Sequence, residues 1–178
     1  MEQVISIGKQ DYEEIIKENY FYIDKTDFIR EWWESGDDVT LITRPRRFGK
    51  TLNMSMLKCF FSNQYSGKDY LFKNLSIWKN LKYQNLHGNF PVIYMSFADV
   101  KADNYEECRN GIIAIINEVY QSHRYLLKSD ILTEGEIELF KVLDCYTSDP
   151  SPNKRITNEI ISRSIKTLSS CLMRFYGK

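Results

Sequence analysis

The residues best suited to chemistry are Gly49, Lys50 and Thr51, which follow an arginine-rich loop. A glycine lets the backbone approach an anion closely, and the free amides and dipole of a first helical turn favour negative charge. A lysine there can reach the β- and γ-phosphates of a nucleotide, and a threonine hydroxyl can bind Mg²⁺. The triplet therefore predicts a nucleotide-phosphate site, with Thr51 as the metal-binding residue.

The elements on either side of this triplet have the order of a P-loop. The apolar run at 39–42 predicts a buried strand, and the apolar spacing over 49–62 predicts a helix. Where the consensus has its first glycine, this chain has Arg44 followed by Pro45, so we expect a different start to the loop. The alternative is a basic loop that caps a helix without binding a nucleotide.

The predicted site comprises the end of the loop and the first helical turn. Its residues are Arg46, Arg47, Phe48, Gly49, Lys50, Thr51 and Leu52. The two arginines can neutralise a γ-phosphate, although a substrate contact or a surface role is equally open. The aromatic residues at 20–22 can wall an adenine ring or pack against the core.

Length and composition fit one domain with a sizeable core. The chain has 178 residues, 43% of them hydrophobic, and equal numbers of basic and acidic residues. A formal net charge of zero argues against a large nucleic-acid footprint. The four cysteines are widely spaced, which favours reduced thiols in a cytoplasmic protein over a metal site. No apolar run approaches the ~20 residues of a membrane span, and no signal peptide is recognisable.

The other patterns predict helices and one further strand, at 91–97. Asp99 follows that strand. Because ligands bind at the carboxyl ends of parallel strands, Asp99 can orient water or Mg²⁺, or it can be an ordinary turn or cap residue. We expect His87 to be a solvated loop residue. Capping residues and apolar periodicity predict helices over 11–17, 26–35, 104–124, 134–146 and 156–176.

Residues 40–57, TLITRPRRFGKTLNMSML, closely resemble the signature of the bacterial AAA-ATPase-like family. Residues 20–26, YFYIDKT, resemble a segment that precedes it in that family. The resemblance covers nearly the whole chain, but only the N-terminal part of such a protein, in which a PD-(D/E)XK nuclease-like domain usually follows. It implies ATP as the nucleotide, with Mg²⁺. No guanine-reading motif is present in the sequence.

These features together predict an α/β, P-loop NTPase-like fold with an incomplete parallel sheet flanked by helices. We expect a single truncated domain over 1–178, with 1–36 as a small N-terminal extension. The strands that the sheet lacks would leave an exposed sheet edge, to be covered by a partner or by self-association.

Hydrolysis by a P-loop enzyme needs a second, acidic site. An apolar strand ending in Asp-Glu usually supplies it, and the sequence contains none, since the run at 92–97 ends in Ala98-Asp99. In similar proteins a segment like 172–178 leads into that strand. We therefore expect a module that binds ATP but hydrolyses little or none. The alternatives are a module that binds nucleic-acid phosphates through its loop cations, and an inactive fragment of a larger ATPase–nuclease protein.

Overall fold

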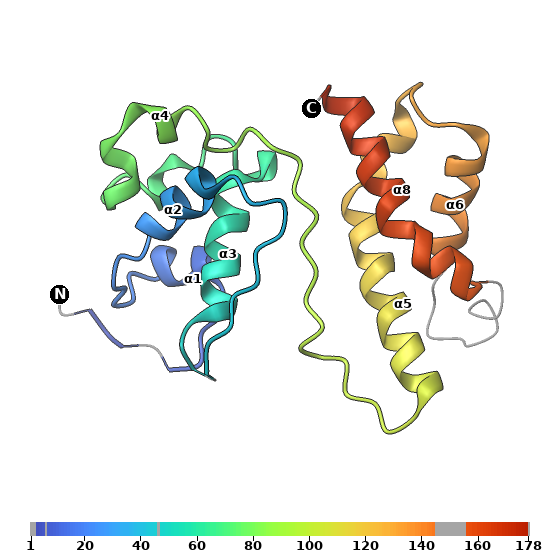
Figure 1. Ribbon diagram of the computed structural model, residues 1–178, viewed down its shortest axis with the longest axis horizontal. Helices are drawn as coiled ribbons and strands as arrows, with labels where there is room; N and C mark the ends of the chain where they lie inside the picture. Colours follow the sequence, from blue (N-terminus) through green and yellow to red (C-terminus); the bar gives the residue numbers. More distant parts are fainter. Residues whose placement is uncertain (1–2, 6, 46, 145–155, 178) are drawn as a thin grey trace. The chain divides into compact units, whose positions relative to one another are not determined.

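The computed structural model describes residues 3–5, 7–45, 47–144 and 156–177. Internal contacts divide the chain into two compact units, residues 1–92 and 93–178 (Figure 1). Each unit has an apolar core of its own. The single domain over 1–178, with its extension at 1–36, stays a prediction.

The first unit is built from short helices around one longer helix, α3. Its elements are α1 (Tyr12–Lys17), α2 (Asp27–Ser35), α3 (Lys50–Phe61), η1 (Asn63–Tyr65), η2 (Asp69–Leu71), η3 (Ser76–Lys79) and α4 (Leu81–Gln84). Local sequence explains the helix ends. Asp11 caps α1 by accepting a hydrogen bond from the Glu14 amide at 2.9 Å, and Gly36 ends α2 in the left-handed conformation.

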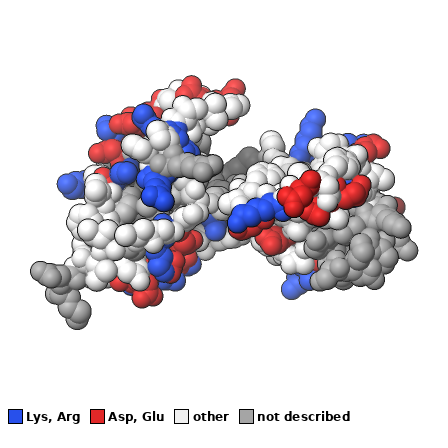
Figure 2. Space-filling model, turned by 90° about the horizontal axis from the view of Figure 1, so that it is seen from below, with Lys and Arg blue, Asp and Glu red and all other residues white. Residues whose placement is uncertain are grey.

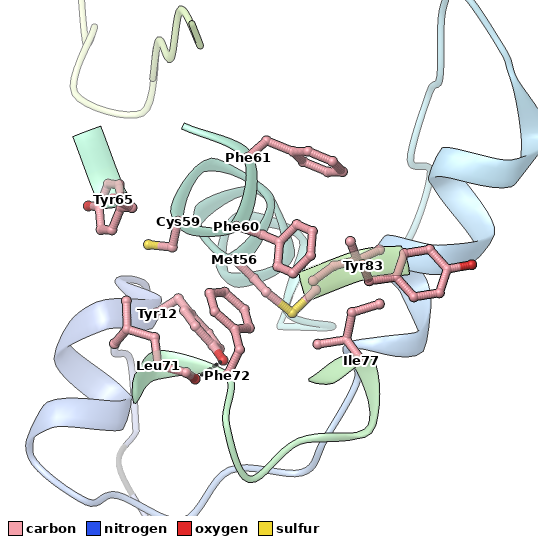
Figure 3. Packing of buried hydrophobic residues seen from close by; sticks show 11 residues of the cluster. Tyr12, Met56, Cys59, Phe60, Phe61, Tyr65, Leu71, Phe72, Ile77 and Tyr83 are labelled. Atoms are coloured by element: carbon pink, nitrogen blue, oxygen red, sulfur yellow. Dashed lines mark hydrogen bonds between the residues drawn. The ribbon is translucent and has the colours of Figure 1, made fainter. Parts of the chain in front are cut away.

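The core of the first unit forms around the inward face of α3 (Figure 3). Met56 and Phe60 of this helix are fully buried. The ring of Tyr12 stacks on Phe72 with a centroid distance of 5.1 Å, and its hydroxyl donates to the Leu71 carbonyl at 2.9 Å. Aromatic packing thus ties α1 and η2 to the helix that follows the predicted phosphate loop.

The second unit is a group of longer helices. Its elements are α5 (Tyr105–Ser122), η4 (Arg124–Lys128), α6 (Glu134–Asp144) and α8 (Asn158–Tyr176). Asn104 caps α5 by accepting from the Glu107 amide at 2.9 Å, as the capping pattern predicts. The helices pack on one apolar core, where the Tyr120 hydroxyl donates to the Ser164 carbonyl at 2.7 Å.

The helix predictions are confirmed. The ranges 11–17, 26–35, 49–62, 104–124, 134–146 and 156–176 correspond to α1, α2, α3, α5, α6 and α8, apart from 145–155, which lies outside the described residues. Capping and amphipathic spacing are local signals, so they locate helices without knowledge of the fold.

The predicted α/β fold with a parallel sheet is wrong. The described residues contain no strand, and their isolated parallel bridge joins Ser62 to Phe90. The predicted strand at 39–42 has no regular secondary structure and is solvated, with Val39 86% and Leu41 83% exposed. A strand needs a hydrogen-bonded neighbour and a half-buried face. An apolar, β-branched sequence supplies the propensity, but not the neighbour.

The second predicted strand, at 91–97, also lacks regular secondary structure and belongs to no sheet. It runs across the boundary between the units, which falls after Val92. Val92 packs against the first core, and Ile93 and Met95 pack against the second. Its apolar residues are therefore anchors for two helical cores, and this accounts for a pattern that resembles a buried strand.

Candidate functional site

The loop before α3 turns sharply into the helix. Arg47 and Gly49 both have left-handed backbones, with φ of 70° and 73°. Glycine adopts this conformation readily, whereas for arginine it is uncommon. Gly49 is the N-cap of α3, and its carbonyl accepts the Asn53 amide at 2.9 Å. The helix therefore begins at Lys50, as the pattern predicts.

The first turn of α3 leaves backbone donors free. Within the described part of the chain the amides of Thr51 and Leu52 have no backbone acceptor, and no side chain caps the helix. Free amides and the positive end of the helix dipole attract an anion. Thr51 is exposed, so its hydroxyl is open to solvent beside them. This arrangement fits a phosphate group.

Lys50 folds back over the loop. Its ammonium donates to the carbonyls of Arg44 and Pro45, the second at 3.0 Å. Both acceptors are neutral and exposed, so a phosphate oxygen would make a stronger, charge-assisted bond with the same group. Binding a phosphate chain would exchange these internal bonds for ionic ones.

The loop cations have no carboxylate partners in the described residues. No ion pair there involves Arg44, Arg47 or Lys50. On the face drawn in Figure 2, basic and acidic side chains are interspersed. An anion near this loop would thus meet positive charge that the protein does not itself neutralise.

Three further site predictions have different outcomes. Arg46 lies outside the described residues. Phe48 is 61% exposed beside Gly49, so it is available to a ligand rather than to the core. Leu52 packs against the first core, so of its groups only the backbone amide remains free for an anion.

Lys25, from the segment at 20–26, also lies at the loop. The Lys25 Nζ atom is 3.9 Å from the position that a Cβ atom would take on Gly49. The motif at 20–26 was the only signal pointing to this segment, and spacing alone does not place it beside the loop.

The aromatic residues at 20–22 have mixed environments. The Tyr22 hydroxyl donates to the Met56 sulfur at 3.3 Å, and its burial raises the pKa of Tyr22 to about 12. This residue thus packs against the core. Tyr20 and Tyr22 also line a hollow of about 440 Å³ with Tyr70. Whether this hollow holds an adenine ring stays a prediction.

Asp99 lies in an exposed turn of the second unit, where its carbonyl accepts the Lys101 amide at 3.0 Å. A role towards water or Mg²⁺ stays a prediction, because Gly49–Thr51 belong to the first unit. The described residues contain no cluster of three or more histidine, cysteine, aspartate or glutamate side chains suited to a metal ion.

His87 lies in a turn, as predicted, but its ring is not solvated as predicted. Its ring lies edge-on to Phe60, Phe72 and Trp78, with centroid distances of 5.4 to 5.6 Å, and its Nε2 atom is buried without a partner in the described structure. Burial lowers the pKa of His87, against the opposing charge of Asp69. The three rings come from distant positions, so local sequence gives no hint of this environment.

A loop that turns through glycine into a helix beginning Lys-Thr, with free first-turn amides, is the arrangement expected of a P-loop-like anion site. A family described as "AAA-ATPase_like: Predicted AAA-ATPase" matches residues 6–170. The chain therefore belongs to this family, as its signature motif predicts. Family membership suggests a nucleotide and Mg²⁺ as ligands; the nuclease-like domain stays a prediction.

One curated protein is similar to about half of the chain, and the chain spans only a small part of that protein's length. The "Uncharacterized protein in vnfD 5'region" of Azotobacter chroococcum mcd 1 is 33% identical over 94 residues. This alignment covers 52% of the present chain and 17% of the relative. No solved structure matches the chain. Across the described residues, no helix has both the length and the apolar character to cross a membrane.

Proposed function

We propose that this chain binds the phosphate chain of ATP, with Mg²⁺, at the loop and first helical turn around Gly49. The observation that carries the proposal is the free amides of Thr51 and Leu52 next to unpaired loop cations. Anions bind at such helix starts because the amides and the dipole point at them. The family's description, a predicted AAA-ATPase, makes ATP the nucleotide to test.

In this proposal Lys50 leaves the loop carbonyls and binds the β- and γ-phosphates, while the Thr51 hydroxyl is a ligand of Mg²⁺. The bound metal supplies charge neutralisation for the phosphates. Arg46 and Arg47 extend the positive field towards the γ-phosphate. We further propose that hydrolysis is slow in this chain as it stands, because its sequence offers no Asp-Glu strand to hold the metal and polarise water. A cytoplasmic location is part of the same proposal.

The test is ATP titration of the wild type and of Lys50→Ala by calorimetry in excess Mg²⁺. Hydrogen bonds to a charged group contribute about 1.5–3 kcal/mol, so the variant is expected to bind at least about tenfold more weakly. Lys166→Ala removes one charge from an exposed position on α8 and is the matched control. Equal ATP affinity of wild type and Lys50→Ala would refute the proposal.

A second variant separates the metal from the phosphates. Thr51→Ala is expected to weaken binding of Mg²⁺–ATP while leaving the weaker binding of metal-free ATP unchanged, since only the hydroxyl is lost. Steeply salt-dependent binding of an oligonucleotide that ATP does not displace would instead indicate a nucleic-acid phosphate site.

A further inference from the structure

Lys25 approaches the phosphate loop from a different part of the chain. Its Nζ atom lies 3.9 Å from the Cβ position of Gly49, and among the described residues other than Gly49 and its two chain neighbours no other atom lies within 4 Å of that position. Gly49 is the residue at which the loop becomes helix α3. An ammonium group therefore sits beside the backbone that would face a phosphate.

The turn that carries Lys25 is fixed by hydrogen bonds. The carboxylate of Asp24 accepts the Thr26 amide at 2.9 Å and the Thr26 hydroxyl at 2.6 Å, and its second oxygen accepts the Ser76 amide at 2.7 Å. Burial alone would raise the pKa of Asp24, but these hydrogen bonds lower it overall, so the carboxylate is ionised at neutral pH. The Asp24 carboxylate therefore stabilises the turn by accepting these hydrogen bonds.

Tyr22, which precedes this turn in the sequence, connects the turn to α3. The Tyr22 hydroxyl donates to the sulfur of Met56 and also interacts with the backbone of Lys25. Met56 is fully buried in the middle of α3. The backbone of Lys25 and the helix that begins with Lys50 are therefore held together through the core, and the lysine is preorganised next to the loop.

Within the part of the chain that the structure describes, no carboxylate forms an ion pair with the Lys25 ammonium. The neighbouring Asp24 accepts from Thr26 and Ser76. The side chain is exposed, so structural demands on it are few. A preorganised, unneutralised lysine beside free helical amides is suited to bind an anion.

We propose that Lys25 is a second phosphate-binding lysine, which acts with Lys50 on the phosphate chain of the nucleotide. This inference rests on the proposed function of the loop. It gives the segment at 20–26 a direct part in ligand binding, in which Asp24 and Tyr22 hold the turn and Lys25 touches the ligand.

The experiment compares ATP affinity of the wild type, Lys25→Met, Lys25→Arg and Lys166→Met by calorimetry in the full chain. Lys25→Met keeps the length of the side chain and removes the charge, and we expect about tenfold weaker binding. Lys25→Arg is expected to recover most of the affinity, and Lys166→Met to match the wild type. The melting temperature of Lys25→Met without nucleotide is expected to equal that of the wild type.

A second readout tests contact with the phosphates themselves. Inorganic tripolyphosphate is titrated against a fluorescent ATP analogue bound to each variant. If Lys25 binds the phosphate chain, tripolyphosphate alone loses about the same factor of affinity as ATP on Lys25→Met. If Lys25→Met had a lower affinity for ATP but an unchanged affinity for tripolyphosphate, the proposal would be overturned.

The remaining outcomes are also decisive. Unchanged ATP affinity of Lys25→Met, with a clear loss on Lys50→Ala, overturns this inference and leaves the proposed function standing. An equal loss on Lys166→Met, or a lowered melting temperature of Lys25→Met, attributes the effect to net charge or folding and also overturns it. A wild type that binds no ATP overturns both proposals.

Discussion

Replacing Gly49 by alanine separates the conformational demand of the loop from its role in binding. Gly49 has φ of 73°, and among the described residues beyond its chain neighbours a Cβ atom there would meet Lys25 Nζ alone, at an ordinary contact distance of 3.9 Å. The change therefore adds no steric clash. Its penalty is the left-handed backbone, about 1–2 kcal/mol for a residue with a side chain.

The first unit offers a matched control at Gly36, which ends α2 with φ of 67° and has nothing within 4 Å of its Cβ position. Gly36→Ala is expected to lose the same 1–2 kcal/mol. For a unit of this size, residues 1–92, each kcal/mol lowers the melting temperature by about 4–8 °C. Both variants should therefore melt at least about 4–8 °C below the wild type.

Of the two variants, only Gly49→Ala is expected to bind ATP more weakly than the wild type. A methyl group on Gly49 occupies space beside the free amides where a phosphate oxygen would approach. Thermal melting followed by circular dichroism measures the stability, and calorimetry measures the ATP affinity. Equal ATP affinities for Gly49→Ala and Gly36→Ala would refute a phosphate at Gly49. If Gly36→Ala were destabilised but Gly49→Ala were not, the left-handed backbone at Gly49 would be refuted.

Two further predictions concern the core of the first unit. Tyr12→Phe removes the hydroxyl that donates to the buried Leu71 carbonyl, so we expect a loss of about 1–3 kcal/mol in urea unfolding; an unchanged midpoint would contradict the bond. The lowered pKa of His87 means that the unfolded chain binds its proton more readily. Stability from this group is therefore present above pH ~6.5 and is lost as the pH falls below it, and His87→Phe should remove that part of the pH dependence. Identical urea midpoints of wild type and variant across pH 5–8 would contradict a half-buried ring with a lowered pKa.

Helices and their ends could be predicted because their determinants are adjacent in sequence. The cap of α5 needs only Asn104 and Glu107, three positions apart. The strands could not be predicted in the same way, because pairing depends on a distant segment. The apolar run at 39–42 has strand propensity, but its Thr40 hydroxyl instead accepts the indole N–H of Trp32 at 3.1 Å. Strand propensity is a property of one segment, whereas a sheet requires two segments that pair.

In the candidate site too, the residues that are adjacent in sequence could be predicted and the contacts between distant segments could not. Gly49, Lys50 and Thr51 are contiguous, so their type and order predict the loop, the helix start and the free amides. Lys25 reaches Gly49 only because Asp24 binds the Ser76 amide and Tyr22 reaches the middle of α3. These contacts join positions some 30 to 50 residues apart, which no local pattern encodes.

The position of the core along α3 makes variants of the site informative. The fully buried residues of this helix, such as Met56 and Phe60, lie well past its first turn, while Thr51 is exposed. Thr51→Ala therefore removes no packed apolar surface, Lys50 is partly exposed with its ammonium on two loop carbonyls, and alanine has a high helix propensity at both positions. Loss of ATP binding in these variants, with the melting temperature retained, would report on the ligand contacts alone. If they instead unfolded the first unit, the first turn of α3 would be part of its structural core rather than an open anion site.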